Sequence, residues 1–323
     1  MKVKKNTMLL VFIGLLTIII LIEVYLRTYW GFCDSVLMME SKNYEYIEQP
    51  NQNRFRFRHH VFYNSFSMRS PEPDTNVYTI LGFGDSVING GVMVDQDSLA
   101  TTIMSDELTK QLHKKVQVLN VGAGSWGPDN AYAYLEEKGN FNAKVIFLVV
   151  SSHDAYDNMD FMPVLDKVNR YESKQYNLAL WELWVKYIWP RLKDNLKTEE
   201  TEVFKRGKIF NSGFPHFYQY CKSRGLPFYI YLNPDKTELI AHRYNQQGQE
   251  IIKFCKDNSI EVIEGIETTK LEDYRGIIHM NNQGQRHMAN AIKNVILSKV
   301  ITKVESDKNH FSPQYNSTLK VKF

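Results

Sequence analysis

Residues 77–91 read Val-Tyr-Thr-Ile-Leu-Gly-Phe-Gly-Asp-Ser-Val-Ile-Asn-Gly-Gly. The first part of this stretch is mostly apolar and β-branched, which is typical of a strand covered on both faces. Gly84-Asp85-Ser86 follows directly, so the strand is expected to end in a tight turn that carries a serine hydroxyl. Ligands of open parallel sheets bind beyond the carboxyl ends of the strands. Ser86 therefore lies where a nucleophile would meet its substrate, although Gly-Asp-Ser by itself is also an ordinary turn sequence.

Similar apolar runs recur along the chain, separated by longer segments with the periodicity of helices. The further strands are expected at 116–121, 145–151, 227–232 and 260–263, and the helices at 98–114, 129–138, 214–224, 238–257 and 282–303. Strands that alternate with helices predict a parallel sheet with helices on both faces. We therefore expect an α/β domain over residues 76–304, with a doubly wound, flavodoxin-like sheet of about five strands in three αβα layers.

The net positive charge of the chain comes from its N-terminal residues. The 323 residues include 39 basic and 36 acidic ones, a net charge of +3, and residues 1–27 contain four basic residues and one acidic residue. The remainder is neutral and lacks the basic surface of a nucleic-acid-binding protein, so no nucleic-acid partner is expected. Three cysteines do not make a disulfide scaffold. Cys221 and Cys255 either pair in an oxidising compartment or remain two buried thiols.

The N-terminus has the pattern of a membrane anchor. Three lysines precede an uncharged apolar run over residues 8–22, and Glu23 and a short apolar stretch follow before Arg27. A bilayer core requires roughly 20 apolar residues, so residues 1–30 are expected to form a cytoplasmic tip and a transmembrane helix. The lysines predict a cytoplasmic N-terminus and a periplasmic or extracellular domain. A cleaved signal peptide is the alternative, but no small-x-small cleavage site follows the run.

Three segments lie outside the alternating pattern. In the juxtamembrane segment 31–75, Arg54, Arg56 and Arg58 alternate with phenylalanines, which predicts a strand or β-arm with one charged face, or else a site for an anionic polymer. The insertion at about 157–208 contains tryptophans at 181, 184 and 189. It is interpreted either as an extra helix near 176–196 that buries these aromatics or as a lid or binding segment. Residues 305–323 are expected to form a flexible tail.

Three more blocks follow Gly84-Asp85-Ser86 at the ends of expected strands or before the last helix. They are Asn120-Val121-Gly122-Ala123-Gly124-Ser125, Ser151-Ser152-His153-Asp154 and His279-Met280-Asn281-Asn282-Gln283-Gly284-Gln285-Arg286-His287-Met288-Ala289. In their order and placement these four blocks resemble those of the GDSL-type, or SGNH, family of esterases and acyltransferases. The resemblance covers about residues 78–300 without the insertion.

The resemblance implies a role for each block. Ser86 would be the nucleophile, and His279, rather than His287, its general base. The backbone N–H groups of Ser86 and of Ser125 or Gly124 would form the oxyanion hole. His153 stands where the family has a donating asparagine.

The chain departs from the family at the residue that orients the base. The family has an aspartate three residues before this histidine, where this chain has Gly276. Asp273 is the nearby aspartate that could orient His279. The alternative is a Ser-His dyad whose histidine is oriented by a backbone carbonyl.

These roles predict a serine-dependent ester hydrolase that removes O-acyl groups, most plausibly O-acetyl groups, from a cell-surface glycan. An O-acetyltransferase that works beside a membrane acyl-donor partner and an inactive glycan-binding subunit are the alternatives. No cofactor and no metal are expected, because the histidines and acids show no recognisable ligand spacing. The expected partners are an acylated carbohydrate or another ester, and the membrane.

Overall fold

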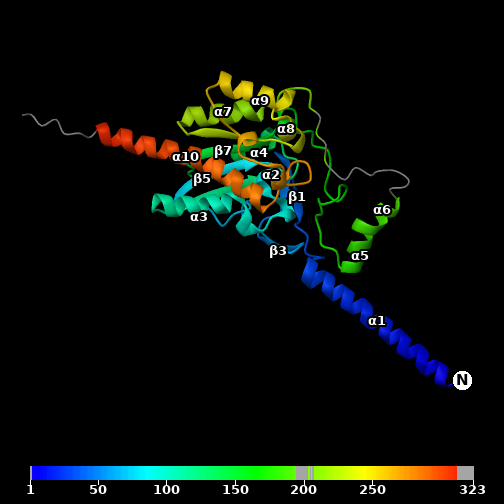
Figure 1. Ribbon diagram of the computed structural model, residues 1–323. Coiled ribbons are helices and arrows are strands. Elements are labelled where there is room, and N and C mark those ends of the chain that lie inside the picture. The colour runs from blue at the N-terminus through cyan, green and yellow to red at the C-terminus, as the bar shows by residue number, and fades with distance from the viewer. Residues whose placement is uncertain (1, 194–202, 204, 206, 311–323) are drawn as a thin grey trace, which may run out of the picture.

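A parallel five-stranded sheet forms the centre of the computed structural model, which describes residues 2–193, 203, 205 and 207–310 (Figure 1). The strand order is β6-β5-β7-β8-β9. The strands are β5 (Tyr78–Gly84), β6 (Val116–Gly122), β7 (Val145–Ser151), β8 (Phe228–Asn233) and β9 (Glu261–Glu264). The chain leaves β5 toward β6 on one side and then fills the other side, which is a doubly wound topology. The expected fold class is confirmed.

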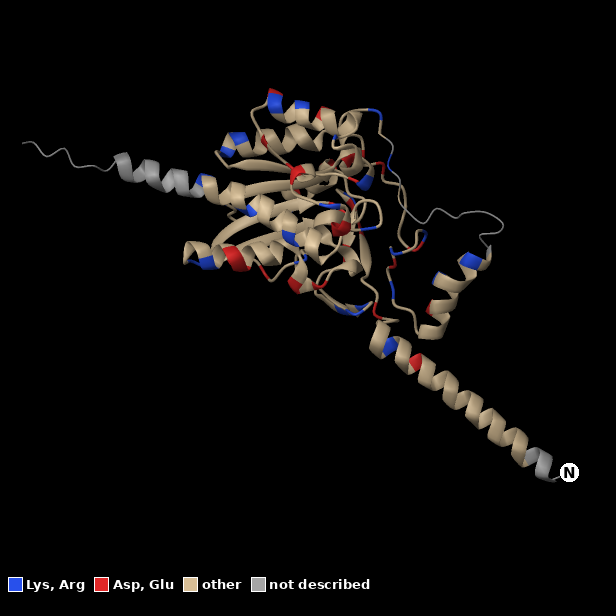
Figure 2. Ribbon diagram, viewed as in Figure 1, with Lys and Arg blue, Asp and Glu red and all other residues tan. Residues whose placement is uncertain are grey.

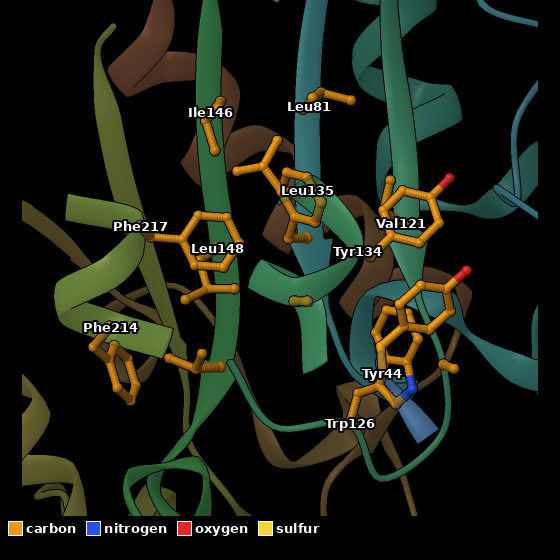
Figure 3. Packing of buried hydrophobic residues seen from close by; sticks show 14 of the residues in the cluster. Tyr44, Leu81, Val121, Trp126, Tyr134, Leu135, Ile146, Leu148, Phe214 and Phe217 are labelled. Atoms are coloured by element: carbon orange, nitrogen blue, oxygen red, sulfur yellow. The ribbon is translucent and has the colours of Figure 1, made fainter. Parts of the chain in front are cut away.

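Helices cover both faces of the sheet. On one face lie α3 (Ala100–Leu112) and α10 (Asn282–His310), and on the other α4 (Pro128–Lys138), α7 (Gly213–Arg224) and α9 (Gln246–Asp257) (Figure 1). Successive strand residues point to opposite faces. Thus Leu81 and Phe83 pack in the cluster beneath α4 and α7, whereas Ile80 packs in the cluster beneath α3 and α10. Figure 3 shows the first cluster, in which Leu148 lies beside Phe217 of α7.

The single helix expected over residues 238–257 is wrong, because the chain forms two helices there. The first is α8 (Lys236–Ala241), and the second is α9. His242 has a left-handed backbone with φ of 47° and ends α8. The side chain of Asn245 then accepts hydrogen bonds from the N–H groups of Gln247 and Gly248, which starts a new helix.

The N-terminal helix α1 (Lys2–Trp30) projects from the domain (Figure 1). Its 25-residue part Asn6–Trp30 includes an 18-residue window with a mean hydropathy of 2.8 and is long and apolar enough to cross a membrane. Figure 2 shows this helix without charge over most of its length. Helices of this length and composition occur both as membrane anchors and as signal sequences.

Two β-hairpins follow α1. The first pairs β1 (Met38–Ser41) with β2 (Glu45–Glu48), and the second pairs β3 (Gln52–Arg56) with β4 (His59–Tyr63). The expected β-arm is present, but its arginines do not form a common charged face. Arg56 is buried, forms an ion pair with Glu182 of the insertion and lies over the ring of Phe57.

The insertion contains three consecutive helical turns. They are α5 (Ala179–Leu183), the π-helical turn η4 (Trp184–Ile188) and α6 (Trp189–Lys193). Of the two interpretations of the insertion, the helix that buries its aromatics is wrong for the tryptophans, which are exposed, and the lid or binding segment stays a prediction.

The two cysteines of the α/β domain are buried and free. Cys221 lies in α7 and Cys255 in α9, on the same side of the sheet. Burial raises the pKa of both thiols to about 12. Of the two alternatives, the structure therefore shows two buried thiols.

Candidate active site

Ser86 lies at the carboxyl edge of the sheet. It is the first residue of α2 (Ser86–Asn89), a one-turn helix that begins where β5 ends. Asp85 caps this helix, because its Oδ1 accepts a hydrogen bond of 2.8 Å from the N–H of Val87. The neighbouring strand approaches closely: a Cβ on Gly122 of β6 would lie 2.6 Å from the carbonyl oxygen of Gly84. The serine is thereby held next to the loop that follows β6.

His279 contacts Ser86 although the two residues lie far apart in the sequence. It begins β11 (His279–Met280), which pairs with β10 (Tyr274–Arg275) just before α10. Its Nε2 lies 2.9 Å from Ser86 Oγ. In the tautomer that leaves Nε2 unprotonated, the ring can accept the hydroxyl proton as a general base. Two residues that are 193 positions apart in the chain thus form a nucleophile–base pair.

Asp273 is bonded to the other histidine of the last block. It ends η6 (Leu271–Asp273) and is fully buried. Its Oδ2 lies 2.7 Å from Nδ1 of His287 and also accepts a hydrogen bond of 2.8 Å from the N–H of Lys270. The structure therefore directs this carboxylate oxygen toward His287, which lies in α10, while a role of Asp273 in orienting His279 stays a prediction.

In the loop after β6, hydrogen bonds from two tyrosines hold the peptide group between Gly124 and Ser125 in place. The hydroxyls of Tyr46 and Tyr171 both donate to the carbonyl oxygen of Gly124, at 3.0 and 3.1 Å. The C=O and N–H of a trans peptide point in opposite directions, so these bonds also fix the direction of the Ser125 N–H. Among the described residues, the N–H groups of Ser86, Gly124 and Ser125 have no hydrogen-bond acceptor. Backbone donors of this kind are what an oxyanion hole requires.

His153 lies beside the nucleophile loop. It is part of η3 (Ser152–Ala155), directly after β7. Asp154 makes the cap at this point, because its Oδ2 accepts a hydrogen bond of 2.7 Å from the N–H of Ser151. The half-exposed ring of His153 has a nitrogen within 4.8 Å of carboxylate oxygens of Asp85 and Asp154. The ring is therefore next to the residue that precedes the nucleophile.

Asp85, His153 and Asp154 are close enough together to hold a metal ion. Burial, reinforced by the nearby Asp85 carboxylate, raises the pKa of Asp154 well above its ordinary value. A proton or a cation would relieve the repulsion between these two buried carboxylates. Burial and the Asp154 carboxylate also raise the pKa of Asp157 to about 7. The Asp157 Oδ2 lies 3.6 Å from Nε2 of His153.

Several residues that support the site carry no sequence motif. Arg69 is buried, and its guanidinium donates to the carbonyl oxygens of Asn89, Gly91 and Val94, which anchors the loop after α2. The side chain of Asn89 in turn donates to the carbonyl oxygen of Gly122 at 2.6 Å. Sequence reasoning missed these residues and the two tyrosines. A single tyrosine, arginine or asparagine has no diagnostic spacing, and its role depends on a distant segment.

A serine–histidine pair at the carboxyl edge of a doubly wound sheet is an arrangement for nucleophilic acyl transfer. No protein-family model and no curated protein sequence matches the chain.

Several solved structures align with about two thirds of this chain at low identity. A member of the lipolytic protein G-D-S-L family from Veillonella parvula is 15% identical with a TM-score of 0.38, and the match covers 68% of this chain and 97% of that one. A lipase/acylhydrolase from Enterococcus faecalis is 11% identical with a TM-score of 0.42, covering 69% and 96%. A carbohydrate acetylesterase from Sinorhizobium meliloti is 12% identical with a TM-score of 0.37, covering 68% and 99%. Similarities this low do not specify a substrate.

Proposed function

We propose that the protein is a membrane-anchored serine esterase that removes O-acyl groups, in particular O-acetyl groups, from a cell-surface glycan. The observation that carries the proposal is the 2.9 Å contact between Ser86 Oγ and His279 Nε2. It lies at the edge of the sheet where the backbone N–H groups of Ser86 and Ser125 have no acceptor among the residues that the structure describes. A nucleophile, a base and oxyanion donors are the groups that ester hydrolysis needs.

The reaction would proceed in two steps. His279 removes the hydroxyl proton as Ser86 Oγ attacks the ester carbonyl carbon, and then donates that proton to the leaving sugar oxygen. The negative carbonyl oxygen of the tetrahedral intermediate accepts hydrogen bonds from the N–H groups of Ser86 and of Ser125 or Gly124. The ring of His153 would supply a third donor. A water molecule, deprotonated by His279, then attacks the carbonyl carbon of the acyl-enzyme. The bond to Ser86 Oγ breaks, His279 returns the proton to that oxygen, and the carboxylic acid is released.

The proposed location is supported by α1 and by its contacts with the domain. The carboxylate of Glu23 in α1 accepts hydrogen bonds of 2.8 and 2.9 Å from the N–H groups of Ala179 and Leu180 in the insertion. Leu26 is buried against the domain. The end of α1 is thus part of the folded protein, which supports a retained anchor over a cleaved signal sequence. Lysines at its start orient the N-terminus toward the cytoplasm and the domain toward the periplasm or exterior.

The test uses the full chain in detergent with an aryl acetate and a serine-reactive fluorophosphonate probe. Replacement Ser86→Ala should lower turnover by about 10⁴-fold or more and abolish labelling. The matched control Ser223→Ala changes an exposed serine of α7 and should leave both unchanged. If the unaltered chain shows neither turnover nor labelling, the esterase proposal is wrong and an inactive glycan-binding subunit is favoured.

The same preparation separates hydrolysis from transfer. The aryl acetate is supplied with and without an oligosaccharide acceptor, and both acetate and acetylated sugar are measured. Free acetate alone supports the esterase, because water then completes the second step. Acetylated sugar would instead identify an O-acetyltransferase, which uses the same Ser86 and His279 with a sugar hydroxyl in place of water.

A further inference from the structure

The helical part of the insertion, Ala179 to Lys193, buries two charged side chains against the domain and exposes its tryptophans. Its domain-facing side contains apolar residues that pack in the cluster around Leu26 and Phe32, and charged residues as well. Glu182 is fully buried, accepts a hydrogen bond of 2.7 Å from the N–H of Cys33 and pairs with Arg56. Lys186 on the same side is buried and pairs with Glu172. A helix at the surface of a soluble protein normally turns its apolar side inward and its charged side outward.

The opposite side is apolar and exposed. Trp181, Trp184 and Trp189 expose 57%, 41% and 46% of their surfaces, and the rings of Trp184 and Trp189 lie 6.1 Å apart. Other large apolar side chains of the segment are exposed with them. The set, called here the tryptophan face, consists of Leu178, Trp181, Trp184, Ile188, Trp189 and Leu192. An apolar surface of this kind indicates a contact with something other than water.

The contacts with α1 indicate what covers the tryptophan face. Glu23 and Arg27 are the first charged residues after the long apolar run of α1, so they mark its end on the side of the domain. Glu23 accepts hydrogen bonds from the first N–H groups of α5, and the Arg27 guanidinium donates to the carbonyl oxygen of Asn177 at 2.5 Å. The segment therefore begins beside the part of α1 that would leave the hydrocarbon core.

The direction of the segment agrees with this position. Figure 1 shows α5 and α6 starting next to the domain end of α1 and running across the direction of α1 rather than along it. If α1 crosses the bilayer, a segment with this direction lies along the membrane surface. Tryptophan is the residue most characteristic of that level of the membrane, because its ring is apolar and its N–H needs a polar partner.

We propose that the tryptophan face lies in the interfacial region of the bilayer leaflet next to the domain, as a second membrane contact beside α1. Amphipathic segments bind at this level by inserting their apolar side among the headgroups and upper acyl chains. The buried Glu182–Arg56 pair joins the segment to the β3–β4 hairpin, so the contact holds the domain at a set height and orientation. This inference rests on the proposed membrane anchor α1 and does not depend on the proposed esterase activity.

The test is the quenching of tryptophan fluorescence by brominated lipid. The full chain with Trp30→Phe is reconstituted in phosphatidylcholine vesicles with or without bromine on the acyl chains. The remaining tryptophans are the three of the tryptophan face and Trp126, which is buried in the core. Brominated lipid should remove about half or more of the emission. In the matched control, which also carries W181F, W184F and W189F, the emission of Trp126 should be unaffected.

Equal emission in both lipids for the Trp30→Phe chain would overturn the proposal. Quenching by acrylamide would then show that the tryptophan face is in water, and protection from acrylamide would show that protein covers it. Neither result bears on esterase activity, which is measured separately on the same preparation with the aryl acetate. Failure of this proposal and failure of the proposed function are therefore distinguishable.

Discussion

Removal of the two tyrosine hydroxyls behind the oxyanion peptide is expected to slow catalysis. Tyr46 comes from the juxtamembrane hairpin and Tyr171 from the insertion, and both donate to the carbonyl oxygen of Gly124. The perturbation is Tyr46→Phe and Tyr171→Phe, singly and together. Phenylalanine preserves the packing of the ring and removes only the hydroxyl. The loss therefore reports on the direction of the Ser125 N–H.

The size of the effect follows from the two bonds. A neutral hydrogen bond contributes about 0.5–1.5 kcal/mol net, which corresponds to about 2- to 12-fold in rate. Each single replacement should lower kcat by no more than that. The double replacement leaves neither hydroxyl to hold the peptide. Loss of one oxyanion donor costs about 2.7–4 kcal/mol, which corresponds to about 10²- to 10³-fold in kcat. The double variant should thus lose more than the product of the single losses.

The assay is the steady-state hydrolysis of an aryl acetate by the full chain, with kcat and KM measured separately. A peptide that stabilises only the transition state affects kcat and leaves KM nearly constant. Tyr134→Phe is the matched control, because it removes another buried hydroxyl that donates to a carbonyl, that of Phe66, at 2.7 Å. The reasoning would be refuted by a double variant with unchanged kcat, or by an equal loss in the Tyr134→Phe control.

Two further predictions concern buried carboxyl groups. Asp273→Asn should lower the free energy of unfolding by about 1–3 kcal/mol, since it weakens the bond to His287, while kcat/KM changes little; a loss near 10⁴-fold would instead show that Asp273 orients His279. Burial raises the pKa of Glu48 from an ordinary 4.5 to about 7, so the folded chain holds a proton that the unfolded chain releases between these values. The contribution of Glu48 to stability should therefore fall as pH rises from about 4.5 through 7, by up to about 3 kcal/mol. In urea titrations at pH 5 and pH 8, Glu48→Gln should remove this part of the fall, whereas the part that comes from Asp157, whose pKa is also raised to about 7, remains. An equal pH dependence in the Gln variant would contradict that assignment.

The fold could be predicted because its strands are covered on both faces. Such strands appear as continuous apolar runs, and all five runs correspond to strands of the sheet within one residue or so of their expected ends. Helix ends were harder, because the break between α8 and α9 depends on the left-handed backbone at His242 and on the cap made by Asn245. Neither residue interrupts the helical spacing of the apolar residues from which a single helix over 238–257 is expected.

The site could be predicted only in part. Ser86 and His279 stand in local motifs at a strand end and a helix start, and the sheet topology brings such ends to one edge. The partner of Asp273 could not be read from the sequence, since His279 and His287 both lie close to it along the chain. The sequence also could not decide whether the insertion buries or exposes its tryptophans, because helical periodicity shows that two faces differ but not which face meets the domain.

The sequence by itself determined the positions of the strands along the chain, the nucleophile and base candidates and the apolar N-terminal helix, since each depends on residues that are neighbours in the chain. The tertiary structure alone decided that Asp273 bonds to His287, that Tyr46 and Tyr171 meet at Gly124, and that Arg56 is buried against Glu182. These contacts join segments far apart in sequence or choose between two nearby partners. A hydrogen bond forms only when donor and acceptor come within about 3 Å in the right direction, and the packing of whole elements sets that distance.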